Sequence, residues 1–232
     1  MIEQLRNLDN SLLVFLNGSH SGYWDAVMWT VTKTGTWIPL LLMLIFILIK
    51  ECNTRRLIYI LVALVLAILL ADRLSSGLIK PMVMRWRPTH DVTFLHTIDT
   101  VLGYRGGNYG FVSSHAANTF ALFVFLSMLM RSRIVTISLF VWASITSYSR
   151  IYLGVHFPGD ILCGALLGSV VGFLVYYLYS FVCRRTIVEH NYYSTAYTAS
   201  GFHCSDMHLL TLTLVLTYAV VFIAAIPLSM RM

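Results

Sequence analysis

Long apolar segments with almost no charged residues dominate this chain and leave few folds open to it. Six such segments are predicted, at about residues 26–49, 57–79, 114–130, 134–150, 159–183 and 208–227. A helix needs about 20 apolar residues to cross the hydrocarbon core of a bilayer. Only 11% of the residues are charged, against roughly 25% in a soluble domain. We therefore expect an all-α, polytopic membrane helix bundle with about six transmembrane helices.

The first 25 residues are more polar than these segments. Glu3, Arg6 and Asp9 interrupt the leucines there, so this stretch does not resemble a cleaved signal peptide. Apolar residues recur every three or four positions, which indicates either a short helix along the membrane interface or a helix that caps the bundle. We expect one integral membrane domain over residues 1–232, with the interfacial helix in 1–25 and the polar motifs in 72–175.

Positive charges between the spans predict how the bundle is oriented. The loops after the first, third and fifth spans hold Lys50, Arg55, Arg56, Arg131, Arg133, Arg184 and Arg185. By the positive-inside rule these loops are cytoplasmic, so residues 80–113, residues 149–159 and both termini share the outer face. The net charge of +6 forms no basic stripe, so nucleic acid is not expected as a partner.

Three polar stretches fall on this outer face, at residues 80–88, 112–115 and 149–160. The first carries Lys80 and Arg87, and the third carries Arg150. Charges beside membrane spans indicate function by default, and guanidinium and ammonium groups together suit the oxygens of a phosphate ester. The alternative is that each cation only extends to the interface from its span end.

Two serines, Ser113 and Ser114, precede the apolar run that begins at Ala116. Serine is a favoured residue at the start of a helix. The free backbone N–H groups and the positive end of the helix dipole there also favour a bound anion. The sequence therefore predicts a helix start that also faces a phosphate.

His115, His156 and Asp160 supply groups for chemistry on that phosphate. Asp160 lies four residues after His156, across a Phe-Pro-Gly turn. A carboxylate so placed fixes the histidine tautomer and leaves the other ring nitrogen free to attack. His115 can then protonate the departing oxygen. A lone membrane histidine more often only bonds two helices together.

Glycines continue the helical face that Asp160 begins. Gly164, Gly168 and Gly172 follow it at intervals of four residues, so all four lie on one face of the fifth span. Small residues let a second helix approach closely. We expect this face, with Asp160, to point into the bundle and away from lipid.

Together these residues resemble the type 2 phosphatidic acid phosphatase (PAP2) family, whose three motifs are K-x₆-RP, PSGH and SR-x₅-H-x₃-D. Lys80, Arg87 and Pro88 match the first motif, and Ser149, Arg150, His156 and Asp160 match the third. In the second motif Ser113 and His115 match, whereas Val112 and Ser114 replace proline and glycine. The resemblance covers roughly residues 72–175.

The resemblance implies a six-helix membrane core and a metal-independent hydrolysis that passes through a phosphohistidine on His156. His115 would be the acid for the leaving group and Asp160 the partner of His156. Five residues would bind the phosphate: Lys80, Arg87, Ser113, Ser114 and Arg150. No cofactor is expected.

Two other classes compete with a phosphatase. Vanadium haloperoxidases share the family relationship and a similar anion cage, but the membrane spans argue against a redox enzyme of that kind. A transporter would place its charges near the bilayer midplane, whereas they gather here at one rim. A metal site at His203, Cys204 and His208 is not favoured, because their spacing matches no standard ligand set.

The substrate is expected to be a membrane lipid phosphate, because a site at the outer rim is open to head groups while the lipid chains stay in the bilayer. Undecaprenyl diphosphate is placed first, at the periplasmic face of a bacterial inner membrane. Lipid A, phosphatidylglycerol phosphate and phosphatidic acid are the alternatives. The insert at residues 89–111 is expected either to shape the head-group pocket or to form a solvated lid.

Overall fold

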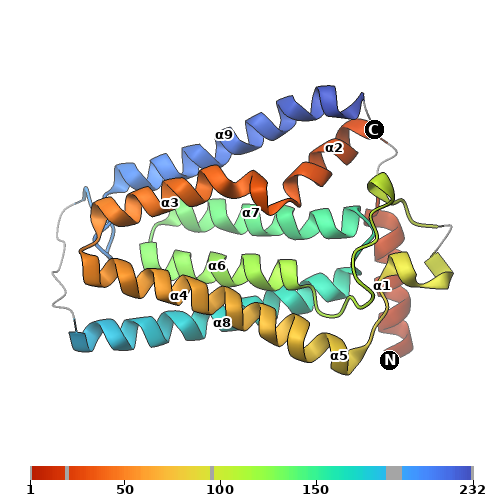
Figure 1. The fold of residues 1–232 in the computed structure, drawn as a ribbon, viewed down its shortest axis with the longest axis horizontal. Helices are drawn as coiled ribbons and strands as arrows, with labels where there is room; N and C mark the ends of the chain where they lie inside the picture. Colours follow the sequence, from red (N-terminus) through yellow and green to blue (C-terminus); the bar gives the residue numbers. More distant parts are fainter. Residues whose placement is uncertain (1, 19–20, 95–96, 187–194, 231–232) are drawn as a thin grey trace.

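The computed structural model describes residues 2–18, 21–94, 97–186 and 195–230, and the regular elements of this part of the chain are helices (Figure 1). In chain order they are α1 (Ile2–Leu16), α2 (Gly22–Val31), η1 (Thr34–Trp37), α3 (Ile38–Glu51), α4 (Thr54–Asp72), η2 (Arg73–Ile79), α5 (Lys80–Val83), η3 (Pro88–His90), η4 (Val92–Phe94), η5 (Val101–Gly103), α6 (Ser114–Met130), α7 (Arg133–Tyr152), α8 (Pro158–Thr186) and α9 (Cys204–Ser229). The predicted all-α bundle is confirmed.

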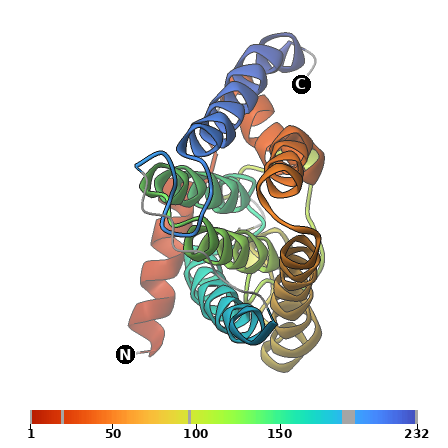
Figure 2. The same ribbon diagram turned by 90° about the vertical axis from the view of Figure 1, so that its left-hand side faces the viewer.

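Five helical segments are long and apolar enough to cross a membrane, and α6 is a shorter sixth. They are Thr34–Glu51, Thr54–Val83, Arg133–Tyr152, Pro158–Thr186 and Cys204–Ser229. Helix α6 lies at the centre of the bundle and packs against α4, α7 and α8 (Figures 1 and 2). Its neighbours shield α6 from lipid. Helix α6 can therefore be shorter than the other spanning helices and does not need one apolar face. The chain is a multi-pass membrane protein.

The first predicted span, 26–49, is not one helix. It breaks after Val31, and the membrane-spanning part begins at Thr34. Gly35 and Pro39 favour a break, because glycine weakens a helix interior and proline suits a first turn. Side chains compensate the freed carbonyls: Trp37 Nε1 donates to the Val31 oxygen at 3.0 Å, and Thr36 Oγ1 donates to the Thr30 oxygen at 2.6 Å.

The second predicted span, 57–79, is longer at both ends. Helix α4 begins at Thr54, where the Asn53 side chain accepts from the Arg56 N–H at 2.9 Å. The helix then continues through the π-helical segment η2 into α5. Segments of π-helix often mark functional positions, and this one ends directly before Lys80. The backbone leaves the helix at Met84, which adopts a left-handed conformation with φ 49°.

Helices α6 and α8 meet through small residues, as the glycine spacing predicts. A side chain at Gly164 would collide with the Ser113 carbonyl, and side chains at Gly168 and Gly172 would collide with those of Ala117 and Ala121. The two helix backbones are therefore in direct contact. This contact fixes the first turns of both helices relative to one another, and both turns carry predicted site residues.

Helix α1 lies across one end of the bundle, roughly perpendicular to the long helices (Figures 1 and 2). Leu13 is completely buried in a small core with Phe157, whereas Leu5, Leu8 and Phe15 are exposed. One side of the helix thus caps the bundle, and the exposed leucines and phenylalanine suit the membrane interface. A helix predicted within 1–25 is thus present at Ile2–Leu16, and its place at the membrane interface stays a prediction.

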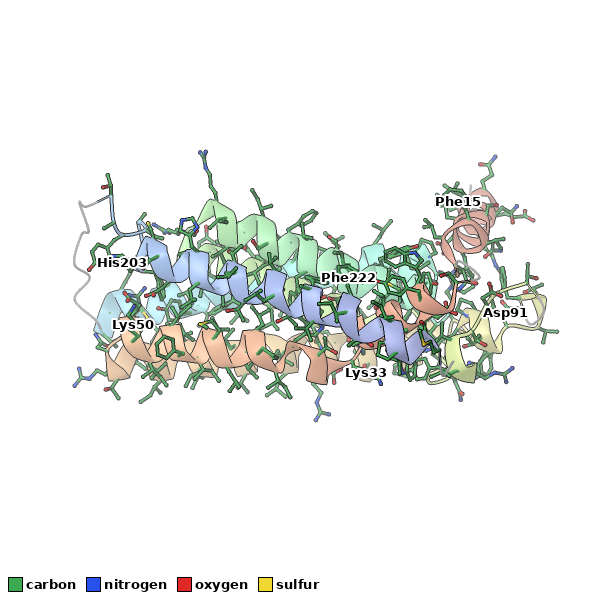
Figure 3. The ribbon with its side chains drawn as sticks, turned by 90° about the horizontal axis from the view of Figure 1, so that it is seen from above. Phe15, Lys33, Lys50, Asp91, His203 and Phe222 are labelled. Atoms are coloured by element: carbon green, nitrogen blue, oxygen red, sulfur yellow. The ribbon has the colours of Figure 1, made fainter. Side chains whose placement is uncertain are left out.

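The cationic loops and the polar motifs lie at opposite ends of the molecule. Lys50 and His203 mark one end in Figure 3, and Asp91 and Phe15 mark the other. The turns after α3 and α6 and the end of α8, which hold the predicted cytoplasmic cations, all lie at the first end (Figure 1). All three polar stretches lie at the second end, the one that α1 crosses.

Candidate functional site

The site forms where loops join α5, α6, α7 and α8 at the end of the bundle. The extended segment 85–87 carries two arginines, and residues 108–110 hold it in place. The Arg87 N–H donates to the Asn108 oxygen at 3.0 Å, and the Gly110 N–H donates to the Arg85 oxygen at 2.8 Å. Because side chains alternate along an extended chain, Arg85 and Arg87 both turn inward while Trp86 is exposed.

The central feature of the site is the buried pair His156 and Asp160, which are 2% and 0% exposed. His156 Nδ1 lies 3.3 Å from Asp160 Oδ2, and the same oxygen accepts from the Phe157 N–H at 3.1 Å. An ionised carboxylate can only accept hydrogen bonds, so the contact assigns the ring proton to Nδ1. The second ring nitrogen, Nε2, then carries a free lone pair.

The surroundings of His156 keep its ring neutral. Burial holds the pKa of His156 well below its usual value of 6.5, and the charges of Arg87, Arg150, Lys80 and His115 lower this pKa further. The neutral imidazole therefore persists at neutral pH, and only this form can attack an electrophile. Because these charges act on the ring, the three predicted cations and the second histidine all lie near His156.

Two arginines beside the pair lack carboxylate partners in the described part of the chain. Arg87 Nε donates to the Tyr109 oxygen at 3.1 Å, and Arg150 donates to Thr32 Oγ1 at 2.8 Å and to Tyr104 Oη at 3.3 Å. Among the described residues no acceptor contacts the buried Arg87 Nη1 and Arg150 Nε. Burial and the charge of Arg150 lower the pKa of Arg87. Buried cations without counter-charges favour a bound anion.

The start of α6 brings the second motif to the same place. Ser113 caps the helix, as predicted: its hydroxyl accepts from the Ala116 N–H at 3.5 Å, and its own N–H donates to the Asp160 carbonyl at 3.0 Å. Ser114 Oγ accepts from Lys80 Nζ at 2.7 Å. The hydroxyl that replaces the family's glycine thus holds the lysine against the helix N-terminus.

The insert at 89–111 contacts Arg87 and the pair of His156 and Asp160; whether it shapes a head-group pocket or forms a solvated lid stays a prediction. Gly110 passes so close to His156 and Asp160 that a side chain there would lie 2.7 Å from Asp160 Oδ2 and 3.6 Å from His156 Nδ1. Gly106 has φ +67°, and a side chain there would lie 2.5 Å from Arg87 Nη1. Only glycine allows the insert to approach both groups.

Several residues at the site were not predicted from the sequence. Arg85 forms ion pairs with Asp160 and Asp9, and Thr32 accepts a hydrogen bond from Arg150. Arg85 lies inside the first motif, two residues from Arg87. Its position in the sequence does not show that it pairs with carboxylates while Arg87 is left for a phosphate. Asp9, on α1, is far away in the sequence.

The described residues contain no group of three or more histidine, cysteine, aspartate or glutamate side chains that could hold a metal ion. Around the cluster considered in the sequence, His203 Nδ1 instead contacts Ser205 Oγ at 2.6 Å. No disulfide joins the four cysteines, which all lie in the described part of the chain.

A buried imidazole–carboxylate pair facing three cations at the rim of a membrane bundle defines a membrane-bound phosphoryl-transfer enzyme. Residues 56–184 match the PAP2 superfamily, and the chain belongs to this family. It is a lipid phosphatase.

Relatives with known names agree with this class. The chain is 39% identical over 179 residues to a lipid A 4'-phosphatase of Bacteroides thetaiotaomicron, which covers 77% of this chain and 80% of the relative. It is 34% identical to a lipid A 4'-phosphatase of Porphyromonas gingivalis, over 79% of this chain and 78% of the relative. An undecaprenyl-diphosphatase of Sulfolobus acidocaldarius is 29% identical over 74% of this chain and 79% of the relative.

A solved structure supports the same fold. The crystal structure of Aquifex aeolicus LpxE superposes with a TM-score of 0.57 at 25% identity, and the match covers 72% of this chain and 94% of that one. The two chains thus share a fold over most of their length.

Proposed function

We propose that this protein removes the 4'-phosphate of lipid A at the outer face of a bacterial inner membrane. The observation that carries the substrate is the similarity to two lipid A 4'-phosphatases, at 39% and 34% identity over more than three quarters of the chain. The similarity to an undecaprenyl-diphosphatase is lower. Lipid A therefore replaces undecaprenyl diphosphate, which the sequence alone placed first.

The proposed reaction uses the site residues in two steps. His156 Nε2 attacks the phosphorus, the bond from phosphorus to the sugar oxygen breaks, and His115 gives that oxygen a proton. Water then attacks the phosphohistidine while His115 takes the proton back, which releases inorganic phosphate and restores both histidines. Asp160 orients His156 through the 3.3 Å contact. Lys80, Arg87, Ser113, Ser114 and Arg150 bind the phosphate oxygens.

The three cations stabilise the charge that develops on the transferring group. They supply at this site the positive charge that metal ions supply in other phosphatases. We therefore expect full activity in excess chelator, and loss of activity that magnesium restores would contradict the proposed mechanism.

An apolar cavity of about 380 Å³ supports a lipid substrate. It extends from His115 between α3, α4, α6 and α7, and its walls include Leu41, Leu64 and Trp142. Helices α3 and α4 pack only weakly against each other and diverge toward the site (Figure 1). An acyl chain in this cavity would place the leaving group beside His115, the proposed acid.

The distribution of cations supports an outer-facing site. The loops rich in lysine and arginine lie at the end of the bundle opposite His156, and such loops are typically cytoplasmic. An impermeant thiol reagent on intact cells should label a cysteine introduced at Asn108, which is exposed in the insert. It should not label Cys52 or Cys204 at the other end. The reverse pattern would place the site in the cytoplasm.

Phosphate release from four purified lipids tests the proposed substrate. Wild-type protein in detergent is given lipid A, undecaprenyl diphosphate, phosphatidylglycerol phosphate or phosphatidic acid, and mass spectrometry locates the phosphate removed from lipid A. We expect the highest kcat/KM for lipid A, with loss at the 4'-position. Faster hydrolysis of any of the other three lipids would contradict the proposal.

A further inference from the structure

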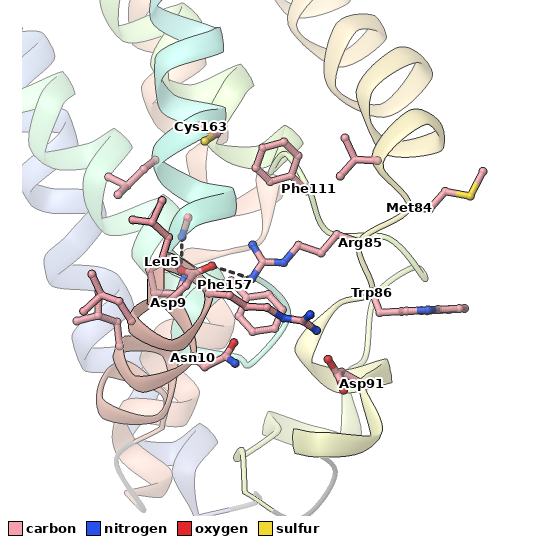
Figure 4. A pocket seen from close by; sticks show the side chains of 17 residues that line it. Leu5, Asp9, Asn10, Met84, Arg85, Trp86, Asp91, Phe111, Phe157 and Cys163 are labelled. Carbon is pink, nitrogen blue, oxygen red and sulfur yellow. Dashed lines mark hydrogen bonds and ion pairs between the residues drawn. The ribbon is translucent and has the colours of Figure 1, made fainter. Parts of the chain in front are cut away.

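Arg85 contacts two carboxylates from distant parts of the chain. Its Nη1 donates to Asp160 Oδ1 at 3.0 Å, and its Nη2 donates to Asp9 Oδ2 at 2.7 Å. The guanidinium carbon also lies 3.9 Å from the centre of the Phe157 ring. Figure 4 shows Arg85 reaching from the extended segment to Asp9 on α1, across the wall of a cavity of about 780 Å³.

Asp160 depends on this arginine for its charge. The carboxyl group is completely buried, and its Oδ2 already accepts from His156 and Phe157. His156 is neutral, so it brings no compensating charge. An isolated buried carboxylate is strongly disfavoured. Among the described residues, Arg85 is the permanently charged cation that forms an ion pair with Asp160.

Asp9 holds the other side of the arginine and also the start of α8. Its Oδ1 accepts from the Gly159 N–H at 2.7 Å, within the first turn of the helix that carries Asp160. A carboxylate at a helix N-terminus is favourable, because free N–H groups point toward it there. Asp9 thus connects α1 with Arg85 and with the first turn of α8.

We propose that Arg85 and Asp9 are positioning residues that keep Asp160 ionised and aligned with His156 Nδ1, so that the interfacial helix α1 helps to set the geometry of the catalytic pair. The inference rests on the proposed roles of His156 and Asp160. Without the arginine, a buried carboxyl group favours its protonated form and donates to Nδ1 instead of accepting from it. The ring proton then resides on Nε2, which cannot attack phosphorus.

Arg85→Met tests the arginine, with Arg6→Met as the matched control. Arg6 lies on α1 and lines the same cavity, but it is exposed. We expect Arg85→Met to lower kcat about 10- to 100-fold, the range typical of residues that orient a catalytic group through hydrogen bonds. KM should change less than about twofold, because the phosphate-binding cations are untouched. Arg6→Met should match wild type within about twofold.

Two milder variants separate positioning from folding. Arg85→Lys keeps one charge and should recover part of the lost kcat. Asp9→Asn keeps an acceptor for Gly159 but loses the charge, and we expect kcat to fall about threefold. In an Arg85→Met background the Asp9→Asn substitution should have no further effect, because Asp9 acts through the arginine.

Each outcome decides the proposal. Equal kcat for Arg85→Met and wild type, additive effects of the two substitutions, or a rise in KM with unchanged kcat would each overturn it. So would a fall in kcat that Arg85→Lys does not relieve and that follows the loss of folded protein in size-exclusion chromatography. If wild type releases no phosphate from any lipid and behaves as His156→Ala does, the proposed function fails. That result is distinct from the four results that overturn the positioning role of Arg85 and Asp9.

Discussion

Arg85 and Arg87 belong to one extended segment and both turn inward, yet they end in different surroundings. Arg85 lies between the carboxylates of Asp9 and Asp160. Arg87 ends among cations, where burial and the charge of Arg150 lower its pKa, and its Nη1 contacts no acceptor in the described part of the chain. A paired arginine is part of the protein's own structure, whereas an unpaired buried arginine favours an external anion.

The difference shows that residue type and motif position do not by themselves assign a role. Both arginines lie within eight residues of Lys80, and both approach the same catalytic pair. What separates them is the charge of their neighbours. A substitution of Arg85 should therefore impair the orientation of the nucleophile, whereas a substitution of Arg87 should impair phosphate binding.

The largest effect is expected at His156, the proposed nucleophile. His156→Ala should lower turnover by about 10⁴-fold or more, because the nucleophile itself is lost. Brief incubation of wild type with labelled substrate should leave acid-labile phosphate on His156, and the variant should carry none. His208→Ala, an exposed histidine on α9 at the opposite end, is the control and should behave as wild type. Near-normal turnover by His156→Ala would contradict the role of His156 as the nucleophile, on which the comparison of the two arginines depends.

The next largest effect distinguishes the two arginines directly. Arg87→Met should lower kcat/KM by about 10²- to 10³-fold, because it removes a cation from the developing charge of the transition state. Orthovanadate mimics that state when it becomes five-coordinate, so inhibition by it should weaken strongly in Arg87→Met.

Arg85→Met, in contrast, should retain the wild-type inhibition constant for orthovanadate. Equal weakening in the two variants would show that both arginines bind the anion, and the comparison would then be wrong.

A smaller effect is expected on the lipid side of the site. Ile68 lines the apolar cavity on α4, and Ile68→Trp should lower kcat/KM for long-chain lipids about tenfold by filling it. Hydrolysis of a short soluble phosphate ester should be unchanged, because the phosphate-binding groups are intact. Ile58→Trp, on the same helix but outside the cavity, is the control. Equal losses for both kinds of substrate would argue against the cavity as the chain-binding site.

The smallest effect concerns protonation of the nucleophile. Because burial and the nearby cations hold the pKa of His156 below 6.5, its ring should remain neutral when the pH falls from 8 to 6.5 and gain a proton only at lower pH. Nitrogen NMR of histidine-labelled protein without substrate measures this, with His156→Gln to assign the signal. Titration at or above pH 6.5 would contradict the environment described for the ring.

Local signals predicted most of the fold. Ser113 and Pro158 begin their helices as capping preferences require, and glycines four residues apart predicted that a second helix would pack closely on α8. The break between α2 and α3 was missed, because mean hydropathy stays high across it. The compensating bonds from Thr36 and Trp37 become visible only in three dimensions.

The sequence also indicated which residues would gather at the site, since motif spacing brought His156 and Asp160 into contact and the span topology placed the cations at one end. It did not indicate Asp9. The Arg85–Asp9 contact spans 76 residues, and no local pattern links an interfacial helix to a loop after the second span. Such pairings depend on tertiary structure and not on periodicity.

The direct backbone contact between α6 and α8 limits how this scaffold can acquire new substrates. A larger residue at Gly164, Gly168 or Gly172 would push the two helices apart and with them Ser113 and Asp160. That half of the site is therefore closed to gradual redesign. Libraries that aim to change the accepted chain length should instead vary α3 and the exposed face of α4, because neither carries His156, Asp160 or the proposed phosphate-binding residues.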